Sequence, residues 1–349
     1  MAKIKKEEKL EKSSTIEIDD IIIKEFGKVI VSAETIKQTN YKIIPTTPKI
    51  DIALGGGISE GTLTILSASP KHGKTCLALQ IARNALAIDS DFGQREVYYL
   101  NIESRIKERD LNGIKGLDAS KIKIIKSTAG NILSGEDFLK IGEKIINAKP
   151  GAVIIFDSFS ALCSKERSES DLADRFRDTI PQSIASFIRR IAPVISINKS
   201  IILGINHMYA NTSGKGNKTW LESSGQKIQY GLDQKLMGAY TKPWIDLQGN
   251  QIGLEVFWKV VTTYLSGGKL GEINTFLKFG EGYSDIQEYI DLATDVGIID
   301  KKGAGWFTYK DIKLQGMDKL RIKLEEDPNL FAELKAEVDT IFKPKHDII

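Results

Sequence analysis

One octapeptide constrains the fold of this 349-residue chain more than any other stretch. It reads Ala68-Ser-Pro-Lys-His-Gly-Lys-Thr75 and lies between an apolar run at residues 62–66 and a segment with helical apolar spacing at residues 76–87. It matches the phosphate-binding loop pattern G-x-x-x-x-G-K-[ST], except that alanine replaces the first glycine. A buried strand, this phosphate loop and a helix are therefore predicted in succession. A chance Gly-Lys-Thr at a helix start is much less consistent with that context.

The residue types of the phosphate loop suit a bound triphosphate. A strand that turns into a helix directs backbone N–H groups and the positive end of the helix dipole at one point. Gly73 lets the backbone approach the phosphates, Lys74 can reach the β- and γ-oxygens, and the Thr75 hydroxyl can join a Mg²⁺ shell. The other residues expected to line the nucleotide site are Ser69, Pro70, Lys71, His72 and Cys76. If position 68 requires a positive φ, Ala68 strains the loop, whereas a requirement for a small side chain alone tolerates it.

Composition excludes several classes of protein. Lysine and arginine number 49 and aspartate and glutamate 46, so any affinity for nucleic acid must come from local patches. With 41% hydrophobic residues the chain can form one large or two moderate domains. Two cysteines without C-x-x-C spacing, and only three histidines, argue against a disulfide framework or a zinc site. No run reaches the ~18 apolar residues of a membrane span, and residues 1–14 are charged, so we expect a cytoplasmic protein with no membrane partner.

Two carboxylates follow predicted strands and are candidate catalytic groups. Residues 97–102 form an apolar strand that ends at Glu103, and residues 152–156 form another that ends at Asp157. Because the carboxyl ends of strands border the ligand crevice in open α/β sheets, Glu103 is expected beside the γ-phosphate, where a carboxylate can activate a water. The alternative for Glu103 is an ordinary acid at a helix N-terminus. Asp157 has the Walker B position, at which an acid holds the water shell of Mg²⁺.

Three further segments carry functional predictions. Residues 15–28 crowd six apolar side chains into a short amphipathic segment, which packs on the core or, as we favour, on another subunit. Residues 165–178 are dense in charge, and a mobile loop and a solvated helix face are equally consistent with them. Residues 208–229 have no periodicity and combine glycine and serine with three lysines and Trp220. That composition suits a loop that binds a nucleic-acid strand, although a solvated linker fits equally well.

Periodicity predicts the remaining elements. A strand is expected at 121–126, helices at 135–148 and 180–197 with the second interrupted at Pro193, and another strand at 201–205 that leads to Asn206-His207. Antiparallel strands are expected at 254–265 and 274–279, followed by a small helical domain with a hairpin at 286–342.

Together these residues resemble the RecA family of recombinases over about residues 47–342. The matching motifs are residues 50–54, Gly73-Lys-Thr75, Asn101-Ile-Glu103, Phe156-Asp-Ser158, Gly204-Ile-Asn-His207, Phe279-Gly-Glu-Gly282 and Gly303-Ala-Gly-Trp-Phe-Thr-Tyr309. The last two, with Asp327-Pro-Asn before the final helix, are specific to RecA-like chains among phosphate-loop ATPases. Residues 205–209 and 246–249 look most like the RecA-type recombinases of large bacteriophages.

The resemblance implies an α/β fold with a RecA-like P-loop ATPase core around a mostly parallel sheet. It also implies an N-terminal helical oligomerisation segment and a small C-terminal α+β domain, with expected boundaries at 1–40, 41–272 and 273–349. The implied activity is a DNA-dependent ATPase that uses ATP and Mg²⁺. It would form a helical filament on single-stranded DNA, pair it with homologous double-stranded DNA and exchange strands. Single-strand-binding and mediator proteins are candidate partners, in the host-cell cytoplasm if the protein is phage-encoded.

The resemblance also assigns roles to residues. Glu103 looks like the catalytic carboxylate, Lys74 a catalytic cation, Asp157 with Thr75 the metal site, and His207 the γ-phosphate sensor. Residues 165–178 and 208–229 resemble the two DNA-binding loops. The residues expected to contact DNA are Arg167, Arg175, Arg177, Arg189, Lys215, Lys218, Trp220, Ser223, Ser224 and Gly225.

One departure and two alternatives limit what the resemblance implies. Thr262 and Tyr264 stand where cellular RecA places two lysines across the protomer interface, so the interface contribution to catalysis is an open question. An accessory or mediator protein could bind ATP and DNA without strand exchange, and a hexameric helicase motor could use the same core. The joint presence of Lys74, Glu103 and Asp157 favours the recombinase over the first, and the C-terminal motif argues against the second.

Overall fold

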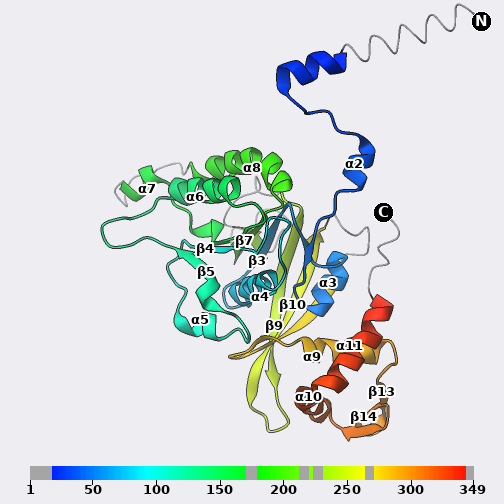
Figure 1. Ribbon diagram of the computed structural model, residues 1–349. Helices are drawn as coiled ribbons and strands as arrows, with labels where there is room; N and C mark the ends of the chain where they lie inside the picture. The colour runs from blue at the N-terminus through cyan, green and yellow to red at the C-terminus, as the bar shows by residue number, and fades with distance from the viewer. Residues whose placement is uncertain (1–17, 170–178, 212–219, 223–230, 264–270, 343–349) are drawn as a thin grey trace, which may run out of the picture. The chain divides into compact units, whose positions relative to one another are not determined.

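The computed structural model describes residues 18–169, 179–211, 220–222, 231–263 and 271–342, which belong to two compact units, Met1–Tyr41 and Lys42–Ile349 (Figure 1). In the first unit residues 18–26 are helical, and α2 spans Ala33–Lys37 with the Ser32 hydroxyl accepting from the Thr35 N–H. Most apolar side chains of the helix at 18–26 are exposed, with Ile18 58% and Phe26 65% exposed, and Ile22 is half-buried. A helix that leaves such a face uncovered has apolar surface available for another partner.

A large mixed sheet forms the centre of the second unit. Six adjacent strands run parallel in the spatial order β9 (Gln234–Ile245), β3 (Thr62–Ala68), β7 (Ile201–Ala210), β6 (Val153–Asp157), β4 (Val97–Asn101) and β5 (Ile122–Ile125). Beyond β9 the sheet continues antiparallel through β10 (Gln251–Thr262), β11 (Glu272–Lys278) and β12 (Gly282–Tyr283), and β8 (Trp220–Glu222) pairs with β7. Every residue of β3 is buried, as expected for a parallel strand covered on both faces.

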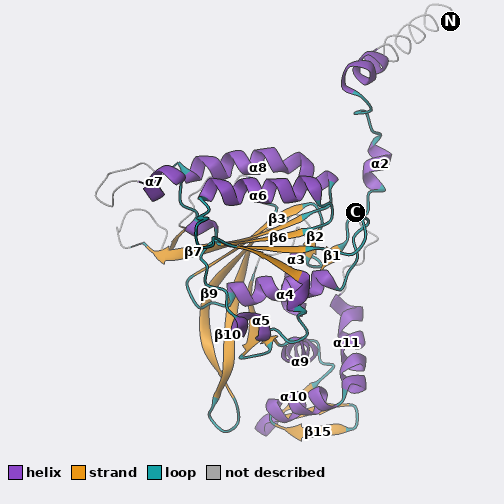
Figure 2. Ribbon diagram, turned by 60° about the vertical axis from the view of Figure 1, so that its left-hand side comes forward, coloured by secondary structure: helices purple, strands orange, loops and turns teal. Residues whose placement is uncertain are grey.

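Helices cover both faces of this sheet (Figure 2). The cluster on one face includes α3 (Pro48–Leu54) and α4 (Lys74–Leu86), and the cluster on the other includes α6 (Gly135–Ala148) and α8 (Ile180–Ile197). The shorter elements are β1 (Ile43–Ile44), β2 (Ile58–Ser59), α5 (Glu108–Asn112), η1 (Ala119–Lys121), η2 (Phe159–Ala161) and α7 (Lys165–Glu169). None of the helices in the described ranges is both long and apolar enough to span a bilayer. The expected α/β fold around a mostly parallel sheet is confirmed.

Several expected boundaries are wrong for identifiable reasons. Helix α8 continues through Pro193. Proline has no N–H to bond the carbonyl oxygen one turn earlier, but Pro193 is exposed, so water can reach that oxygen. Strand β7 runs past its expected end to Ala210 and pairs with β8, so residues 208–229 are not structureless throughout. Strand β9 was not expected, because Gly238 and Pro243 interrupt its pattern. Past Met237 it pairs only with β10, and a proline is tolerated on such an edge.

The C-terminal part forms a small domain with its own apolar core. It consists of α9 (Asp285–Asp295), a three-stranded antiparallel sheet of β13 (Asp300–Lys302), β14 (Trp306–Tyr309) and β15 (Ile312–Gln315), the turn η4 (Gly303–Gly305), α10 (Met317–Glu326) and α11 (Pro328–Phe342). Helix α9 attaches to the start of α3. The Glu288 carboxylate accepts from the Lys49 backbone N–H at 2.9 Å, and the Lys49 ammonium lies 2.7 Å from Asp291.

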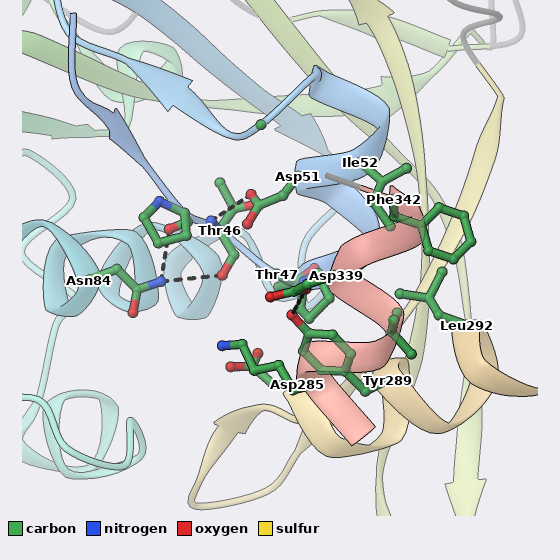
Figure 3. Close-up of a pocket in the computed structure, with 15 residues that line it drawn as sticks. Thr46, Thr47, Asp51, Ile52, Asn84, Asp285, Tyr289, Leu292, Asp339 and Phe342 are labelled. Atoms are coloured by element: carbon green, nitrogen blue, oxygen red, sulfur yellow. Dashed lines mark hydrogen bonds between the residues drawn. The ribbon is translucent and has the colours of Figure 1, made fainter. Parts of the chain in front are cut away.

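A cavity of about 380 Å³ lies at this junction, between α3 and helices α9 and α11 (Figure 3). Asp51, Asp285 and Asp339 line it; Asp51 accepts from the Thr46 N–H and hydroxyl at 2.7 Å, and Tyr289 donates to Asp339 at 2.9 Å. Burial raises the pKa of Asp51 to about 8 and also raises the pKa of Asp285. Asp51 and Asp285 therefore keep their protons to higher pH than exposed carboxyl groups, which limits charge repulsion between them.

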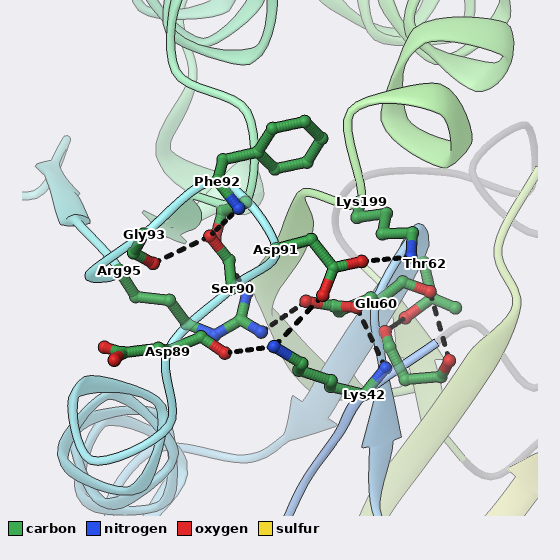
Figure 4. A network of polar contacts seen from close by, with 12 residues as sticks. Lys42, Glu60, Thr62, Asp89, Ser90, Asp91, Phe92, Gly93, Arg95 and Lys199 are labelled. Atoms are coloured by element: carbon green, nitrogen blue, oxygen red, sulfur yellow. Dashed lines mark hydrogen bonds and ion pairs between the residues drawn. The ribbon is translucent and has the colours of Figure 1, made fainter. Parts of the chain in front are cut away.

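A polar network fixes the opposite end of the sheet from the phosphate loop (Figure 4). The Arg95 guanidinium pairs with Glu60, both side chains being 0% exposed, and also donates to the Gly151 carbonyl at 2.8 Å. The second Glu60 oxygen accepts from the Lys42 N–H at 2.9 Å, where the chain enters the second unit. Asp91, by contrast, is 45% exposed and pairs at the surface with two lysines, Lys42 at 3.0 Å and Lys199 at 2.5 Å. The network therefore contains the buried Arg95–Glu60 pair and two pairs formed by an exposed carboxylate.

Truncating the two acids of this network should have unequal effects. Glu60→Ala leaves the Arg95 charge buried and unpaired, so we expect the free energy of unfolding to fall by about 3–5 kcal/mol. Asp91→Ala removes the two pairs of a solvent-screened carboxylate, with Lys42 and Lys199, and should cost much less stability. Urea unfolding of both variants beside the wild type is the measurement. Equal losses would contradict a special role for the buried pair.

Candidate active site

The phosphate loop joins β3 to α4 with glycine at the helix N-cap. Gly73 has φ +73°, and a Cβ at this position would lie 2.5 Å from the Tyr283 hydroxyl. Position 73 therefore requires glycine for two reasons, the positive φ and the close approach of the Tyr283 side chain from β12. Lys71 also has a positive φ, of 64°. The loop is thus a tight turn built to expose backbone N–H groups at the helix start.

The Lys74 side chain folds back so that its ammonium group contacts the phosphate loop itself. Its Nζ donates to the carbonyl oxygens of Ala68 and Ser69, at 2.8 Å in each case. Burial lowers the pKa of Lys74 to about 8, while the negative charges of Asp157 and Glu103 oppose that shift. A buried cation held by two neutral carbonyls has a strong electrostatic preference for an anion placed within its reach. The lysine therefore fits a phosphate ligand.

The structure shows whether position 68 requires a positive φ or only a small side chain. This residue ends β3 and its φ does not lie in the left-handed region. A Cβ built on Gly238 of β9, however, would lie only 2.6 Å from the Ala68 Cβ. The position therefore requires a small side chain rather than a positive φ, and Gly238 provides the space for the alanine methyl group.

Thr75 and Asp157 come together beside Lys74. The Thr75 hydroxyl donates to Asp157 Oδ2 at 3.2 Å, and the Tyr99 hydroxyl donates to the same oxygen. Burial raises the pKa of Asp157. Within the described ranges no three His, Cys, Asp or Glu side chains gather as a metal cluster. A hydroxyl and a single carboxylate suit Mg²⁺, which commonly completes its octahedron with water and substrate phosphate oxygens.

Glu103 is held by three donors. The Ser158 hydroxyl donates at 2.6 Å, His207 Nε2 lies 2.5 Å from the same Oε1, and the Arg105 guanidinium lies 3.2 Å from Oε2. The His207 hydrogen bond is the largest cause that lowers the Glu103 pKa, to about 2. The helix-cap alternative for Glu103 is wrong, because α5 begins only at Glu108. The carboxylate instead lies at the edge of a cavity of about 460 Å³, whose lining includes Pro70 of the phosphate loop.

The structure thus brings together Lys74, Thr75, Glu103, Asp157 and His207. The other residues of the phosphate loop are next to these side chains in the chain. His72 Nδ1 lies 3.0 Å from the Pro70 carbonyl oxygen. Burial raises the pKa of the Cys76 thiol to about 11. His207 does not end its strand, since β7 extends three residues further.

Sequence reasoning missed four residues that contact these groups, namely Tyr99, Arg105, Ser158 and Ser160. The two serines follow Asp157 at a strand end, and that position was the available signal. Tyr99 lies inside an apolar run and carried no signal.

The residues expected to contact DNA remain predictions. Arg167 lies in α7, Arg189 is exposed on α8, and Trp220 begins β8. The others, Arg175, Arg177, Lys215, Lys218, Ser223, Ser224 and Gly225, lie outside the described residues. At the expected protomer interface, Thr262 ends β10, and Tyr264 also lies outside the described residues.

The fold and the site define an α/β protein built around a phosphate-binding loop. Family models for the RecA N-terminal domain and the RecA C-terminal domain match residues 15–214 and 287–343. The chain is 27% identical to Protein RecA of Caldanaerobacter subterraneus subsp. tengcongensis over 330 residues, covering 91% of this chain and 90% of that protein. It is 25% identical to Protein RecA of Thermus aquaticus over 321 residues, covering 91% of each. The chain belongs to the RecA family of recombinases.

The contact between Ala68 and Gly238 is testable by a double-mutant cycle. Gly238→Ala should displace the end of β3 and weaken both thermal stability and nucleotide binding. Ala68→Gly alone should cost only about 0.5–1 kcal/mol of stability. The double variant should recover most of the loss, because the clash involves only these two methyl groups. Thermal unfolding and binding of a fluorescent nucleotide measure both effects. A marked gain in nucleotide affinity from Ala68→Gly alone would instead indicate that the position does require a positive φ.

Proposed function

We propose that this protein is an ATP-dependent DNA recombinase. It assembles as a filament on single-stranded DNA, pairs that strand with a homologous duplex and exchanges strands, with ATP hydrolysis stimulated by DNA. The observation that carries the proposal is the contact between Glu103 and His207. It joins the candidate water-activating carboxylate directly to β7, the strand that leads into the second expected DNA loop.

The nucleotide would be held by residues of the phosphate loop. Backbone N–H groups at the start of α4 and the Lys74 ammonium bind the phosphates, while Thr75 and Asp157 hold the metal shell. Bound Mg²⁺ neutralises phosphate charge and orients the γ-phosphate. Lys74 exchanges its two carbonyl acceptors for phosphate oxygens, which are stronger partners for a cation.

Glu103 is restrained as a base while the three donors hold it. A carboxylate with a pKa of about 2 takes a proton from water poorly. His207 can donate from Nε2 to only one acceptor at a time, so donating to a phosphate oxygen removes the largest cause of that low pKa. The same ring movement would therefore sense the γ-phosphate and release the base. Filament contacts and DNA then favour the released state.

DNA binding and assembly would use segments outside this site. The residues expected to contact DNA lie in or beside the two loops, at 165–178 and 208–229. The exposed apolar face of residues 18–26 supports docking of the N-terminal segment on a neighbouring protomer. Single-strand-binding and mediator proteins would act as partners. Residues 205–209 and 246–249 support a bacteriophage recombinase that acts in the host-cell cytoplasm.

An accessory protein that binds ATP and DNA without strand exchange is the alternative. It would have no chemical need for a carboxylate held ready beside the γ-phosphate position. The restrained Glu103, with its serine, histidine and arginine donors, therefore favours an enzyme that hydrolyses ATP.

The role of Glu103 predicts a separation of binding from hydrolysis. Glu103→Gln keeps the shape of the side chain and removes the base, so ATP binding should persist while hydrolysis falls by about 10²- to 10⁴-fold. Lys74→Ala, in contrast, should weaken ATP binding itself. Equilibrium binding and steady-state hydrolysis with single-stranded DNA measure both. Hydrolysis by Glu103→Gln within a few-fold of the wild type would mean that another group activates the water.

Electron microscopy tests the recombinase proposal as a whole. With single-stranded DNA and a non-hydrolysable ATP analogue, the protein should form helical filaments that disappear when ADP replaces the analogue. Closed rings would indicate a helicase-like motor, and lack of assembly would indicate an accessory protein. A strand-exchange assay on the same preparation completes the test.

A further inference from the structure

The turn after Asp157 contains two serines with contacts to opposite neighbours. Strand β6 lies between β4 and β7 in the sheet, so its end faces Glu103 on one side and His207 on the other. The Ser158 hydroxyl donates to Glu103 at 2.6 Å. Ser160, two residues later in η2, contacts β7 instead. The proposed mechanism gives no role to Ser160.

Regular pairing between β6 and β7 ends before His207. The last registered pair with β7 is Phe156 with Gly204; Asp157 still pairs with Asn101 of β4, and the chain then enters the turn η2. The Phe159 ring occupies the space above Gly204, where a Cβ would lie 2.3 Å from a ring atom. On its other side β7 still pairs with β3 as far as Ala68 and His207. Residues 205–207 therefore need a different hydrogen-bond partner on the β6 side.

Ser160 supplies that partner. Its hydroxyl oxygen accepts from the His207 backbone N–H at 2.6 Å and donates its proton to Asn206 Oδ1 at 2.6 Å. A hydroxyl has one proton and two lone pairs, so both bonds form together. Asn206 is 1% exposed, so its amide is buried, while Ser160 and His207 border the cavity. The serine hydroxyl continues the hydrogen bonding of the sheet where the backbone of β6 has left it.

We propose that Ser160 is a positioning residue that couples the turn after Asp157 to His207 and to the segment that follows β7. The inference rests on the proposed function and concerns how that site is regulated. A displacement of the Asp157 turn between nucleotide states is passed through the Ser160 hydroxyl to the backbone of His207. The histidine ring then sets the Glu103 contact, and β7 carries the displacement toward residues 212–219.

The geometry separates this role from catalysis. Ser160 makes no hydrogen bond to Glu103, Lys74, Thr75 or Asp157 in the described structure, although it borders the same cavity. Loss of its hydroxyl should therefore spare nucleotide binding and disturb the link between nucleotide and DNA. A serine that only stabilised the fold would lower the melting temperature and leave that link intact.

The test compares Ser160→Ala with Ser160→Thr, which keeps the hydroxyl, and with Ser200→Ala as a matched control. Ser200 immediately precedes β7 at its far end; it is fully buried, whereas Ser160 is half-buried, and the Ser200 hydroxyl has no hydrogen-bond partner within the described ranges. The quantity measured is the ratio of single-stranded DNA dissociation constants with ADP and with a non-hydrolysable ATP analogue, at one salt concentration. Ser160→Ala should lower this ratio about fivefold or more, with nucleotide affinity nearly unchanged. Ser160→Thr and Ser200→Ala should retain it.

The outcomes distinguish this inference from the proposed function. A wild-type ratio of one would contradict the proposed function itself. A wild-type ratio well above one that Ser160→Ala retains would contradict only the role of Ser160. If Ser160→Ala fails to fold, amide hydrogen exchange in the wild-type protein provides the answer. The His207 amide should be strongly protected without nucleotide, and rapid exchange there would overturn the inference.

Discussion

The parallel alignment of β3, β4, β6 and β7 is the constraint on which the site depends. The carboxyl ends of parallel strands lie at the same edge of a sheet, so four segments far apart in sequence place residues within, at or just after these ends close together. The phosphate loop, Glu103, Asp157 and His207 all meet there because of strand order alone. The helices on both faces keep these strands buried and leave the edge as the polar end of an otherwise apolar core.

Charges at this edge compensate one another. Burial lowers the pKa of Lys74, and the Asp157 charge partly offsets that shift; burial raises the pKa of Asp157, and the hydrogen bond from Tyr99 partly offsets it. Glu103 differs because three donors hold it as a carboxylate. The site therefore contains a cation satisfied only by neutral carbonyls and a base restrained by donors that can move. In the proposed function, a bound phosphate gives the Lys74 ammonium a charged partner. The same phosphate draws the His207 donor away from Glu103.

The sequence predicts the strand ends well and their surroundings poorly. Apolar runs place Glu103 and Asp157 to within two residues of their strand ends, and the bounds of α6 agree with the spacing because its two faces differ strongly in polarity. The partners of Glu103 come from three different elements, and no local pattern relates them. The small-residue requirement at Ala68 arises from Gly238, 170 residues later, on a strand that its own glycine and proline conceal.

The two ends of the sheet illustrate different uses of buried polar groups. At the end near Lys42, Glu60 and Arg95 neutralise each other without exposure, and neither can change partner without leaving a buried charge. At the nucleotide end the contacts include those of hydroxyls and an imidazole, which can rotate to a new acceptor at little cost. Ser158 and Ser160 place two such rotatable groups on a single turn, one toward the carboxylate and one toward β7. A fixed end and an adjustable end let nucleotide-driven movement be confined to the edge of the sheet from which the expected DNA loops depart.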